Sequence, residues 1–316
     1  MRISIIIPTY NRADVILRSL ETWTKQTLDM DEFEVIVVDN NSTDGSAGMI
    51  KKFIKPYKNF HYLLETKKGS TNARHAGAKK AKADILMFCD DDGLFNPECV
   101  SEILKVYDER EEVVAVTGKI VIKWDKTPPE WIKAYEFMLG KLDYGNNVKY
   151  DNSFYLNGGI FSIRKKIFYD LGGFNPDLIG DYLVGDGDTG LVLKLHKNNM
   201  LIGYTPFARM EHLQFLNKQG TEKDMGRRFY NVGIGTSYNV FRENNFKYNK
   251  SVLKFILKSF VFFVKKMLEK QYVRHNRQKA YFSFMQRKGE LMFFWNLRIR
   301  EIREEILEAK QVNDTD

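Results

Sequence analysis

Long uninterrupted apolar runs are missing from the sequence. No segment reaches the roughly 20 consecutive apolar residues that a membrane-spanning helix requires, so we expect no transmembrane helix. The apolar run at residues 3–7 ends at Pro8 and lacks a small-residue cleavage site after it. We therefore expect this run to form a first strand and not a signal peptide, which favours a cytoplasmic protein.

Cysteine is also scarce. The chain has two cysteines, Cys89 and Cys99, and their spacing matches no common metal motif. A pair of cysteines does not make a disulfide framework, which favours a reducing compartment. We expect both to be buried core thiols, because cysteine packs as a small apolar residue.

The sequence does contain a globular composition with a basic balance. Its 316 residues are 43% apolar and 14% aromatic, which suffices for one large core and an appendage. The net charge of +8 and the pI near 9.1 favour anionic partners such as phosphates, nucleic acid or lipid head groups. The positive charge concentrates towards the C-terminus and no groove-reading motif is present, so we expect no nucleic-acid partner.

Apolar, β-branched runs alternate with helix-like stretches up to about residue 112. Strands that are apolar throughout are typical of a parallel sheet covered by helices on both faces. The pattern predicts a Rossmann-like α/β domain, whose ligands bind beyond the carboxyl ends of the strands. The expected strands are residues 3–7, 33–39, 60–65 and 85–90.

After residue 112 the sequence predicts more loops, and strand-like and helix-like stretches no longer alternate regularly. We expect further strands in 113–122, near the start of 155–174 and in 201–213, and a helix in 185–200. These patterns predict a domain over 1–220, divided into a nucleotide-binding half (1–112) and an acceptor-binding half (113–220). Residues 221–316 are expected to form a basic helical extension.

One segment of the extension, residues 251–270, predicts an amphipathic basic helix. Its apolar stripe either packs on the rest of the protein or lies on an anionic membrane surface. The stripe comprises Val252, Phe255, Ile256, Ser259, Phe260, Val264, Met267 and Leu268, and the charge comes from Lys254, Lys258, Lys265, Lys266 and Lys270.

Three adjacent carboxylates, Asp90, Asp91 and Asp92, close the apolar run ADILMFCDDDG. Carboxylates gathered at a strand end repel one another, and a hard divalent cation relieves that repulsion. Asp90 and Asp92 are spaced so that an extended backbone sends both side chains the same way. We expect a metal site here, although the aspartates could also merely cap the next helix.

Other strand ends carry polar residues suited to a nucleotide. Asp39 ends the second strand, where α/β nucleotide sites place an acid, and Asn41 follows in a turn-forming stretch. The first strand end offers donors and the third offers cations and a flexible turn for a diphosphate. The candidates there are Pro8, Thr9, Tyr10 and Arg12, and Lys67, Gly69 and Arg74.

Taken together, these motifs resemble the inverting, nucleotide-sugar-dependent glycosyltransferases of family 2, which have the GT-A fold. The resemblance covers roughly residues 1–235 and rests on SIIIPTYNR, VIVVDNNSTDGS, KKGSTNARHAGAKKAKADILMFCDDDG, NGGIFSIRKKIFYDLGGF, GDGDTGLVLKL and the late His212. It implies a Rossmann-like mixed, mainly parallel sheet with helices on both faces, followed by the C-terminal helical extension.

The resemblance also implies roles for the acidic residues. Asp39 would bind a uracil-type base and Asp90 the ribose side, with Asp91 among the nucleotide-binding residues. Asp92 would hold a divalent metal, Mn²⁺ or Mg²⁺, that bridges the diphosphate. His212 would be a further metal or diphosphate ligand.

The catalytic base of the family is an aspartate in an acidic pair at the start of a helix. Here the stretch reads Gly185-Asp186-Gly187-Asp188-Thr189, with glycine where the family has the first acid. Alignment on the Asp-Thr step makes Asp188 the expected base. Asp186 could act instead or share the role, and Asp188 could also merely cap its helix.

Glycines and aromatic residues of the middle region are candidates for the sugar. By the resemblance, Asn157, Gly158 and Gly159 lie under the donor or acceptor sugar, where glycine permits close approach of the backbone. Trp124 could stack on a sugar ring, although burial in the core is the commoner fate of tryptophan.

The resemblance implies transfer of a sugar from a nucleotide-diphosphate sugar, expected to be a UDP-sugar, to a saccharide or lipid-linked saccharide in cell-envelope or surface polysaccharide synthesis. The enzyme would be cytoplasmic and would rest on the inner face of the membrane. Sugar-phosphate nucleotidyl transfer is an alternative, but it calls for a glycine-rich loop after the first strand, and PTYNR is not one. A non-enzymatic, basic nucleic-acid-binding protein is a second alternative, which the pI suggests and the missing groove-reading motif disfavours.

Overall fold

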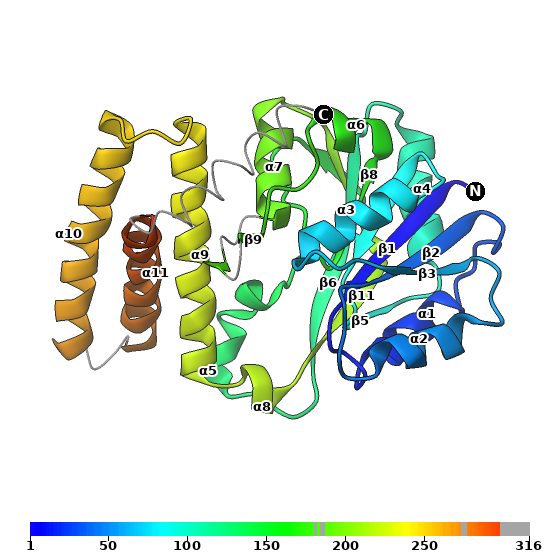
Figure 1. The fold of residues 1–316 in the computed structure, drawn as a ribbon, viewed down its shortest axis with the longest axis horizontal. Helices are drawn as coiled ribbons and strands as arrows, with labels where there is room; N and C mark the ends of the chain where they lie inside the picture. The colour runs from blue at the N-terminus through cyan, green and yellow to red at the C-terminus, as the bar shows by residue number, and fades with distance from the viewer. Residues whose placement is uncertain (180–181, 184–186, 273–276, 298–316) are drawn as a thin grey trace. The chain divides into compact units, whose positions relative to one another are not determined.

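The computed structural model describes residues 1–179, 182–183, 187–272 and 277–297 (Figure 1). The chain divides into two compact units. Unit 1 comprises Met1–Asp125, Ala134–Asn175 and Asp188–Gln214, and unit 2 comprises Lys126–Lys133, Pro176–Gly187 and Phe215–Asp316. The predicted boundary near residue 220 stays a prediction.

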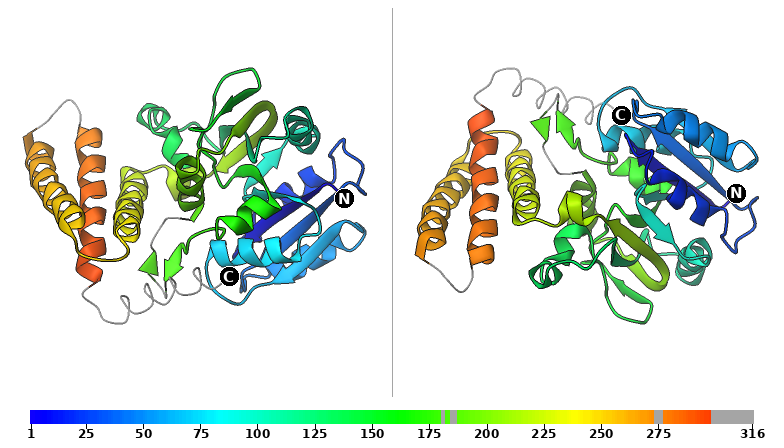
Figure 2. Two further views of the ribbon diagram at one scale, coloured as in Figure 1. Left: turned by 90° about the horizontal axis from the view of Figure 1, so that it is seen from above. Right: turned by 90° about the horizontal axis from the view of Figure 1, so that it is seen from below.

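Unit 1 is built on a sheet in which the described strands number nine. Their order is β3-β2-β1-β4-β8-β6-β11-β5, with β7 paired to β11. Figure 2 shows the ribbon from two further sides. The strands are β1 (Ile3–Thr9), β2 (Phe33–Asp39), β3 (Phe60–Leu64), β4 (Ile85–Cys89), β5 (Gly93–Phe95), β6 (Ala115–Trp124), β7 (Lys149–Asp151), β8 (Ile160–Arg164) and β11 (Ile202–Gln214).

Strand directions in this sheet are mixed. Strands β3, β2, β1 and β4 run parallel, as do β6 and β11. Strand β8 lies antiparallel between β4 and β6, and β5 and β7 run antiparallel to β11. The mixed, mainly parallel α/β fold expected from the sequence is confirmed. The sequence did not indicate β5 and β7, because three residues are too short for a visible alternation.

Helices cover both faces of the sheet, because alternate strand residues point to opposite sides. One face packs on α1 (Ile16–Trp23), α2 (Ser46–Ile54) and α4 (Cys99–Glu109), and this core contains both cysteines. The other face packs on α3 (Ser70–Lys80), α6 (Lys165–Asp170) and α7 (Gly187–Lys197). The cysteines are therefore the buried core thiols that the sequence predicted.

Unit 2 contains the C-terminal helical region, formed by α9 (Glu222–Glu243), α10 (Lys250–Tyr272) and α11 (Arg277–Asn296). A capping box between Thr221 and Asp224 starts α9. The smaller elements of the unit are α5 (Glu130–Lys133), α8 (Leu216–Gln219), β9 (Leu178–Ile179) and β10 (Tyr182–Leu183), whereas the 3₁₀ turn η1 (Glu136–Leu139) belongs to unit 1. Within the described ranges, no helix combines the length and the apolarity needed to cross a bilayer.

Glycine lets α9 and α11 approach closely. A β-carbon on Gly289 would overlap the carbonyl oxygen of Tyr230, and one on Gly233 would overlap that of Gln286. The obstructing atoms are backbone atoms, which cannot turn aside as a side chain can. Two facing helices therefore depend on the absence of two β-carbons.

We expect Gly289→Ala to lower the free energy of unfolding by about 1–3 kcal/mol, since the added methyl group forces the helix backbones apart. Urea unfolding followed by far-UV circular dichroism measures the change. The matched control is Gly48→Ala in α2, where a β-carbon meets no atom within 4 Å. The control should be neutral or slightly stabilising, and equal unfolding midpoints for the two variants would contradict the close-packing argument.

Candidate active site

Two aspartates and a histidine gather at the carboxyl end of β4. Asp90, Asp92 and His212 each present a ligand atom, and these atoms lie within 4.8 Å of one another. Carboxylate oxygens and an imidazole nitrogen suit Mn²⁺, and the carboxylates suit Mg²⁺ as well. These three residues, here called the metal-ligand set, therefore fit a divalent cation, and Asp90 lies at the same point as Asp92.

Pairing of β5 with β11 brings His212 to the aspartates. His212 lies opposite Gly93 in this antiparallel pair, and the backbone N–H of Leu213 donates to the carbonyl oxygen of Asp92 over 3.0 Å. His212 Nε2 then lies 3.1 Å from Asp92 Oδ1. The contact joins residues far apart in the sequence through a strand that the sequence pattern did not indicate.

Burial and charged neighbours shift the pKa values of the three aspartates in different directions. Burial raises the pKa of Asp90, against the opposing charge of Arg74. It also raises the pKa of Asp91 to about 7, although Arg12 opposes the shift. Burial acts in the same direction on Asp92, but the hydrogen bond and charge of His212, with the charge of Arg12, lower the pKa of Asp92 overall.

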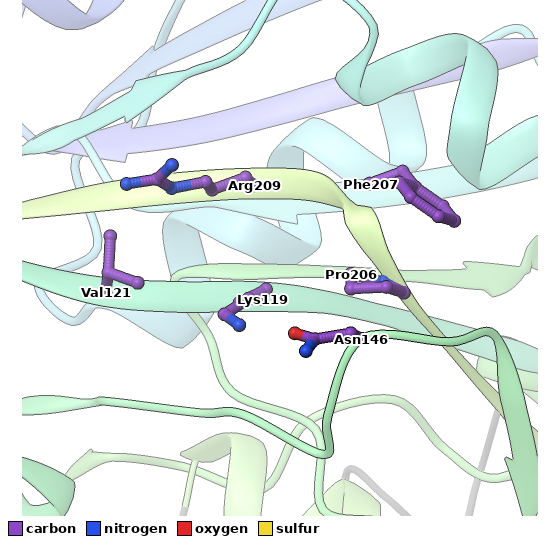
Figure 3. A pocket seen from close by; sticks show the side chains of 6 residues that line it. All are labelled: Lys119, Val121, Asn146, Pro206, Phe207 and Arg209. Carbon is purple, nitrogen blue, oxygen red and sulfur yellow. The ribbon is translucent and has the colours of Figure 1, made fainter.

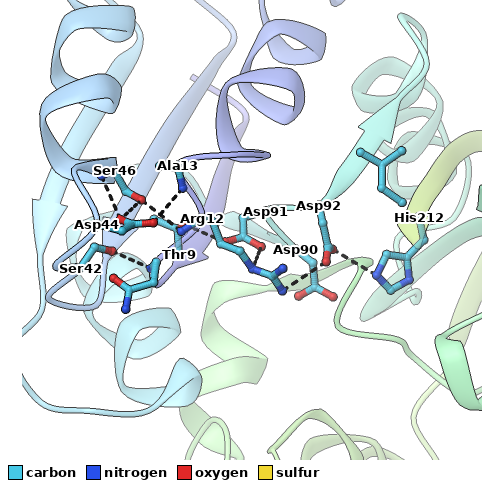
Figure 4. A network of polar contacts seen from close by, with 12 residues as sticks. Thr9, Arg12, Ala13, Ser42, Asp44, Ser46, Asp90, Asp91, Asp92 and His212 are labelled. Atoms are coloured by element: carbon cyan, nitrogen blue, oxygen red, sulfur yellow. Dashed lines mark hydrogen bonds and ion pairs between the residues drawn. The ribbon is translucent and has the colours of Figure 1, made fainter. Parts of the chain in front are cut away.

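Arg12 reaches the aspartates from the loop after β1 (Figure 4). Its Nε lies 3.5 Å from Asp91 Oδ1 and its Nη2 lies 3.4 Å from Asp92 Oδ2. Thr9, the last residue of β1, donates its hydroxyl to Asp91 Oδ2 over 2.7 Å. Asp91 is thus held by the last residue of β1 and by Arg12 in the loop after it.

Hydrogen bonds between residues 11–13, after β1, and residues 43–46, after β2, position Arg12. The backbone N–H of Arg12 donates to Ser46 Oγ over 3.1 Å, and that of Ala13 donates to Asp44 Oδ2 over 3.0 Å (Figure 4). Asn11, with φ of 52°, accepts from the N–H of Thr43 over 2.8 Å. The turn-forming stretch after β2 therefore also anchors the residues that follow β1.

Asp39 lies buried at the end of β2, beside Thr9 in the register of β1 and β2. Its Oδ1 accepts from the N–H of Ser42 over 2.9 Å, and its Oδ2 accepts from the hydroxyl of Tyr62 over 2.7 Å. Burial, together with the hydrogen bond to Asp39 and the negative charge of Asp39, raises the pKa of Tyr62 to about 12. Asp39 is thus a fixed acceptor at the same sheet edge as the metal-ligand set.

The remaining candidates of this edge lie around Asp39. Asn41 adopts a left-handed conformation with φ of 65°, and Tyr10 is 51% exposed. Pro8 pairs with Val38 in the register of β1 and β2. The exposed ring of Tyr10 is available to a planar ligand, whereas Pro8 and Asn41 shape the backbone.

Asn40 was missed by the sequence reasoning. Its Nδ2 donates to the carbonyl oxygen of Lys67 over 2.8 Å and its Oδ1 accepts from the N–H of Gly69 over 2.9 Å. Gly69 has φ of 127°, a conformation that favours glycine. Asn40 therefore holds the turn at residues 67–69 against the end of β2. The sequence signal that could have identified it is a polar residue directly after the aspartate that ends a strand.

Arg74 links the metal-ligand set to Asp188. Its Nη2 donates to Asp90 Oδ1 over 2.7 Å and to the carbonyl oxygen of Gly158 over 3.1 Å. The N–H of Gly158 donates to Asp188 Oδ2 over 2.8 Å. A β-carbon on Gly158 would lie 2.8 Å from Arg74 Nη2 and 3.0 Å from Asp188 Oδ2, so a larger residue here would displace one of these two side chains.

Asp188 lies in the first turn of α7, where Asp188 Oδ1 also accepts from the N–H of Thr189 over 2.9 Å. Each carboxylate oxygen keeps a second lone pair, so these hydrogen bonds leave room for a proton-accepting role, and whether Asp188 caps α7 or acts as the base stays a prediction. Asp186, the alternative base, lies outside the described residues.

Asn157 and Gly159 lie beside the metal-ligand set. The N–H of Gly159 donates to Asn157 Oδ1 over 2.9 Å, and the N–H of Asp90 donates to the carbonyl oxygen of Gly159 over 3.4 Å. A β-carbon on Gly140 would lie 3.2 Å from His212 Nδ1 and 3.4 Å from Asn157 Nδ2. Gly140, with φ of 95°, is a second residue that the sequence reasoning did not identify.

Trp124 ends β6, where it pairs with Gln214, two residues beyond the pair of Ile122 with His212. Because side chains alternate along a strand, Trp124 leaves the sheet on the same face as His212. Its side chain is half-buried, and its indole nitrogen has no hydrogen-bond partner among the described residues. This placement is compatible with either a sugar contact or a core role.

A pocket of about 440 Å³ lies on the opposite face of β6 and β11 (Figure 3). Lys119 and Arg209 face each other across these strands, and neither belongs to the predicted site. Lys119 is paired with Asp143 over 2.8 Å. The candidate active site is therefore the polar edge at the carboxyl ends of β1, β2 and β4, and not this pocket.

Comparison with known proteins gives two kinds of likeness in sequence. Residues 4–172 match the family model described as glycosyl transferase family 2. The uncharacterized glycosyltransferase YfnE of Bacillus subtilis is 28% identical over 192 residues, which are 54% of this chain and 48% of YfnE. The chain thus spans about half the length of this curated relative, and less of several others.

Solved structures share the fold. The mannosyltransferase PcManGT of Pyrobaculum calidifontis, in complex with GDP-Man and Mn²⁺, aligns with a TM-score of 0.60 at 16% identity over 93% of this chain and 87% of that one. Residues 1–349 of TarS of Staphylococcus aureus, in complex with UDP, align with a TM-score of 0.51 at 17% identity over 94% and 91%. The fold is that of the GT-A enzymes, and the family model covers more than half of the chain, so this protein belongs to glycosyl transferase family 2.

Proposed function

We propose that the protein transfers a sugar from a nucleotide-diphosphate sugar, a UDP-sugar, to a saccharide or lipid-linked saccharide with inversion of the anomeric centre. The observation that carries the proposal is the continuous chain of contacts from the Asp90–Asp92–His212 set through Arg74 and Gly158 to Asp188. It connects a site suited to a diphosphate with a carboxylate suited to an acceptor hydroxyl.

The metal of the proposed site would be Mn²⁺ or Mg²⁺, and Asp90, Asp92 and His212 would hold it. When bound, a divalent cation neutralises the charge that builds on the departing diphosphate. Support comes from the donor set itself, and from PcManGT, whose complex contains Mn²⁺ and GDP-Man. Assigning Asp90 to the metal as well as to the ribose side extends the role predicted from the sequence.

The nucleotide would bind along the neighbouring strand ends. Asp39 would accept a hydrogen bond from the base, for which its carboxylate oxygens retain free lone pairs beyond Ser42 and Tyr62. The ring of Tyr10 would lie against the base, and the cations of Arg12 and Lys67 would face the phosphates. Asp91 would act through Arg12, as a positioning residue, since it contacts the guanidinium directly.

Asp188 is proposed as the general base. It would accept the proton of the acceptor hydroxyl while that oxygen attacks the anomeric carbon from the side opposite the diphosphate, which inverts the configuration. The N–H of Gly158 holds one of its oxygens over 2.8 Å and thereby orients the carboxylate. Asp186 stays the alternative predicted from the sequence.

The acceptor would lie towards Asn157, Gly159 and Trp124. We propose a cell-envelope or surface polysaccharide as the product, because relatives include TarS of Staphylococcus aureus, named a poly(ribitol-phosphate) beta-N-acetylglucosaminyltransferase. TarS is 32% identical over 115 residues, which are 36% of this chain and 20% of TarS. A cytoplasmic enzyme at the inner face of the membrane would meet lipid-linked acceptors there.

We expect Asp188→Asn to lower the rate of sugar transfer by roughly 10²–10⁴-fold, because an amide cannot take the proton, while nucleotide affinity changes little. A panel of nucleotide sugars with Mn²⁺ identifies the donor, and calorimetric titration with UDP and Mn²⁺ measures binding. The parallel variant Asp186→Asn separates the two candidate bases. An unchanged rate of sugar transfer by Asp188→Asn would show that Asp188 is not the general base.

We expect Asp92→Ala and His212→Ala each to weaken Mn²⁺-dependent UDP binding at least tenfold, because each removes a metal ligand from a set of three. Calorimetric titration of UDP with and without Mn²⁺ separates the metal contribution from direct nucleotide contacts. The control is Asp170→Ala in α6, an exposed acid paired only with Lys166 in the described contacts. Equal metal dependence in His212→Ala and the unaltered protein would remove His212 from the site.

A further inference from the structure

Helix α10 carries large apolar side chains on its exposed side. We define the exposed stripe as Leu253, Leu257, Phe260, Val261, Met267 and Leu268, with exposed fractions of 55%, 64%, 53%, 58%, 40% and 50%. At 100° per residue these positions fall on one side of the helix. Contiguous apolar surface of this kind marks an interaction site in a folded protein.

The exposed stripe differs from the face that packs within unit 2. Val252 and Ser259 are buried, and Phe255 and Ile256 pack against the core shared with α9 and α11. Ser259 donates to Glu290 over 2.6 Å. The single stripe predicted from the sequence is thus two faces: one completes the helical core, and the other remains exposed.

Lysines line one edge of the exposed stripe. Lys254, Lys258 and Lys265 are exposed and follow the stripe around the helix by a further 20–60° at about 100° per residue. From Lys250 to Leu268 the helix contains no acidic residue. Apolar and cationic groups therefore lie side by side along this part of the helix, and the first acidic residue of α10, Glu269, comes directly after the stripe.

We propose that the exposed stripe binds the surface of an anionic lipid bilayer, with the apolar side chains among the upper acyl chains and the lysines at the phosphates. Interfacial helices combine these two groups on adjacent faces. A protein partner is less suited to this surface, because lysine is depleted from protein interfaces whereas anionic lipids attract it.

This surface belongs to unit 2 and does not involve the residues proposed for sugar transfer. It goes beyond the proposed function in naming the structure that holds the enzyme at a membrane. Vesicle binding is measured without donor or acceptor, and UDP and Mn²⁺ titration of the same preparation tests the proposed function separately. The failure of one proposal is therefore distinguishable from the failure of the other.

The experiment is co-sedimentation of the full chain with vesicles of phosphatidylcholine alone or mixed with phosphatidylglycerol, at low and high salt. We expect binding to the mixed vesicles that falls with salt. Leu257→Asp with Val261→Asp should reduce the partition coefficient roughly tenfold or more, because two apolar anchors become charged. Lys254→Gln with Lys258→Gln should reduce it about fivefold for each lysine.

Matched controls keep the comparison specific. Val232→Asp places an acid at a 42% exposed valine of α9, and Lys79→Gln with Lys80→Gln removes two exposed charges from α3. Both controls should bind vesicles like the unaltered protein, and circular dichroism verifies that each variant is folded. Absence of binding to the mixed vesicles overturns the proposal, as does equal binding by the stripe variants. Self-association that the stripe variants abolish, without vesicle binding, would identify a protein interface instead.

Discussion

Burial of negative charge at the end of β4 is the constraint on which the site depends. Asp91 and Asp92 are each about 6–7% exposed, and like charges so close cannot all be ionised without compensation. The compensation comes from three separate elements: Arg12 after β1, Arg74 in α3 and His212 in β11. Local sequence alone cannot satisfy the aspartates, so the tertiary fold of unit 1 must do so.

The same compensation couples the two functional parts of the site. Arg74 neutralises Asp90 and at the same time fixes the carbonyl oxygen of Gly158, whose N–H holds Asp188. A single guanidinium thus relates the position of the metal-ligand set to that of the proposed base. Glycine at 158 leaves room for both side chains, since a β-carbon there would crowd the ends of Arg74 and Asp188.

The sequence was informative where the signal was local. The apolar strand runs and the polar residues after them predicted β1, β2 and β4 and the edge at which their residues meet. It was uninformative where the partner is distant: Asn40 and Gly140 act through contacts that periodicity does not encode. Only the family resemblance identified His212, because its approach to Asp92 depends on the short strand β5.

Net charge alone is a poor guide to the partner of this protein. The value of +8 averages a buried acidic site with a strongly basic helix, and it favours nucleic acid and lipid equally. The local arrangement discriminates, because the exposed residues Lys254, Lys258 and Lys265 line one edge of the exposed stripe. A nucleic-acid surface needs cations but gains nothing from exposed leucine and valine, whereas a bilayer surface uses both.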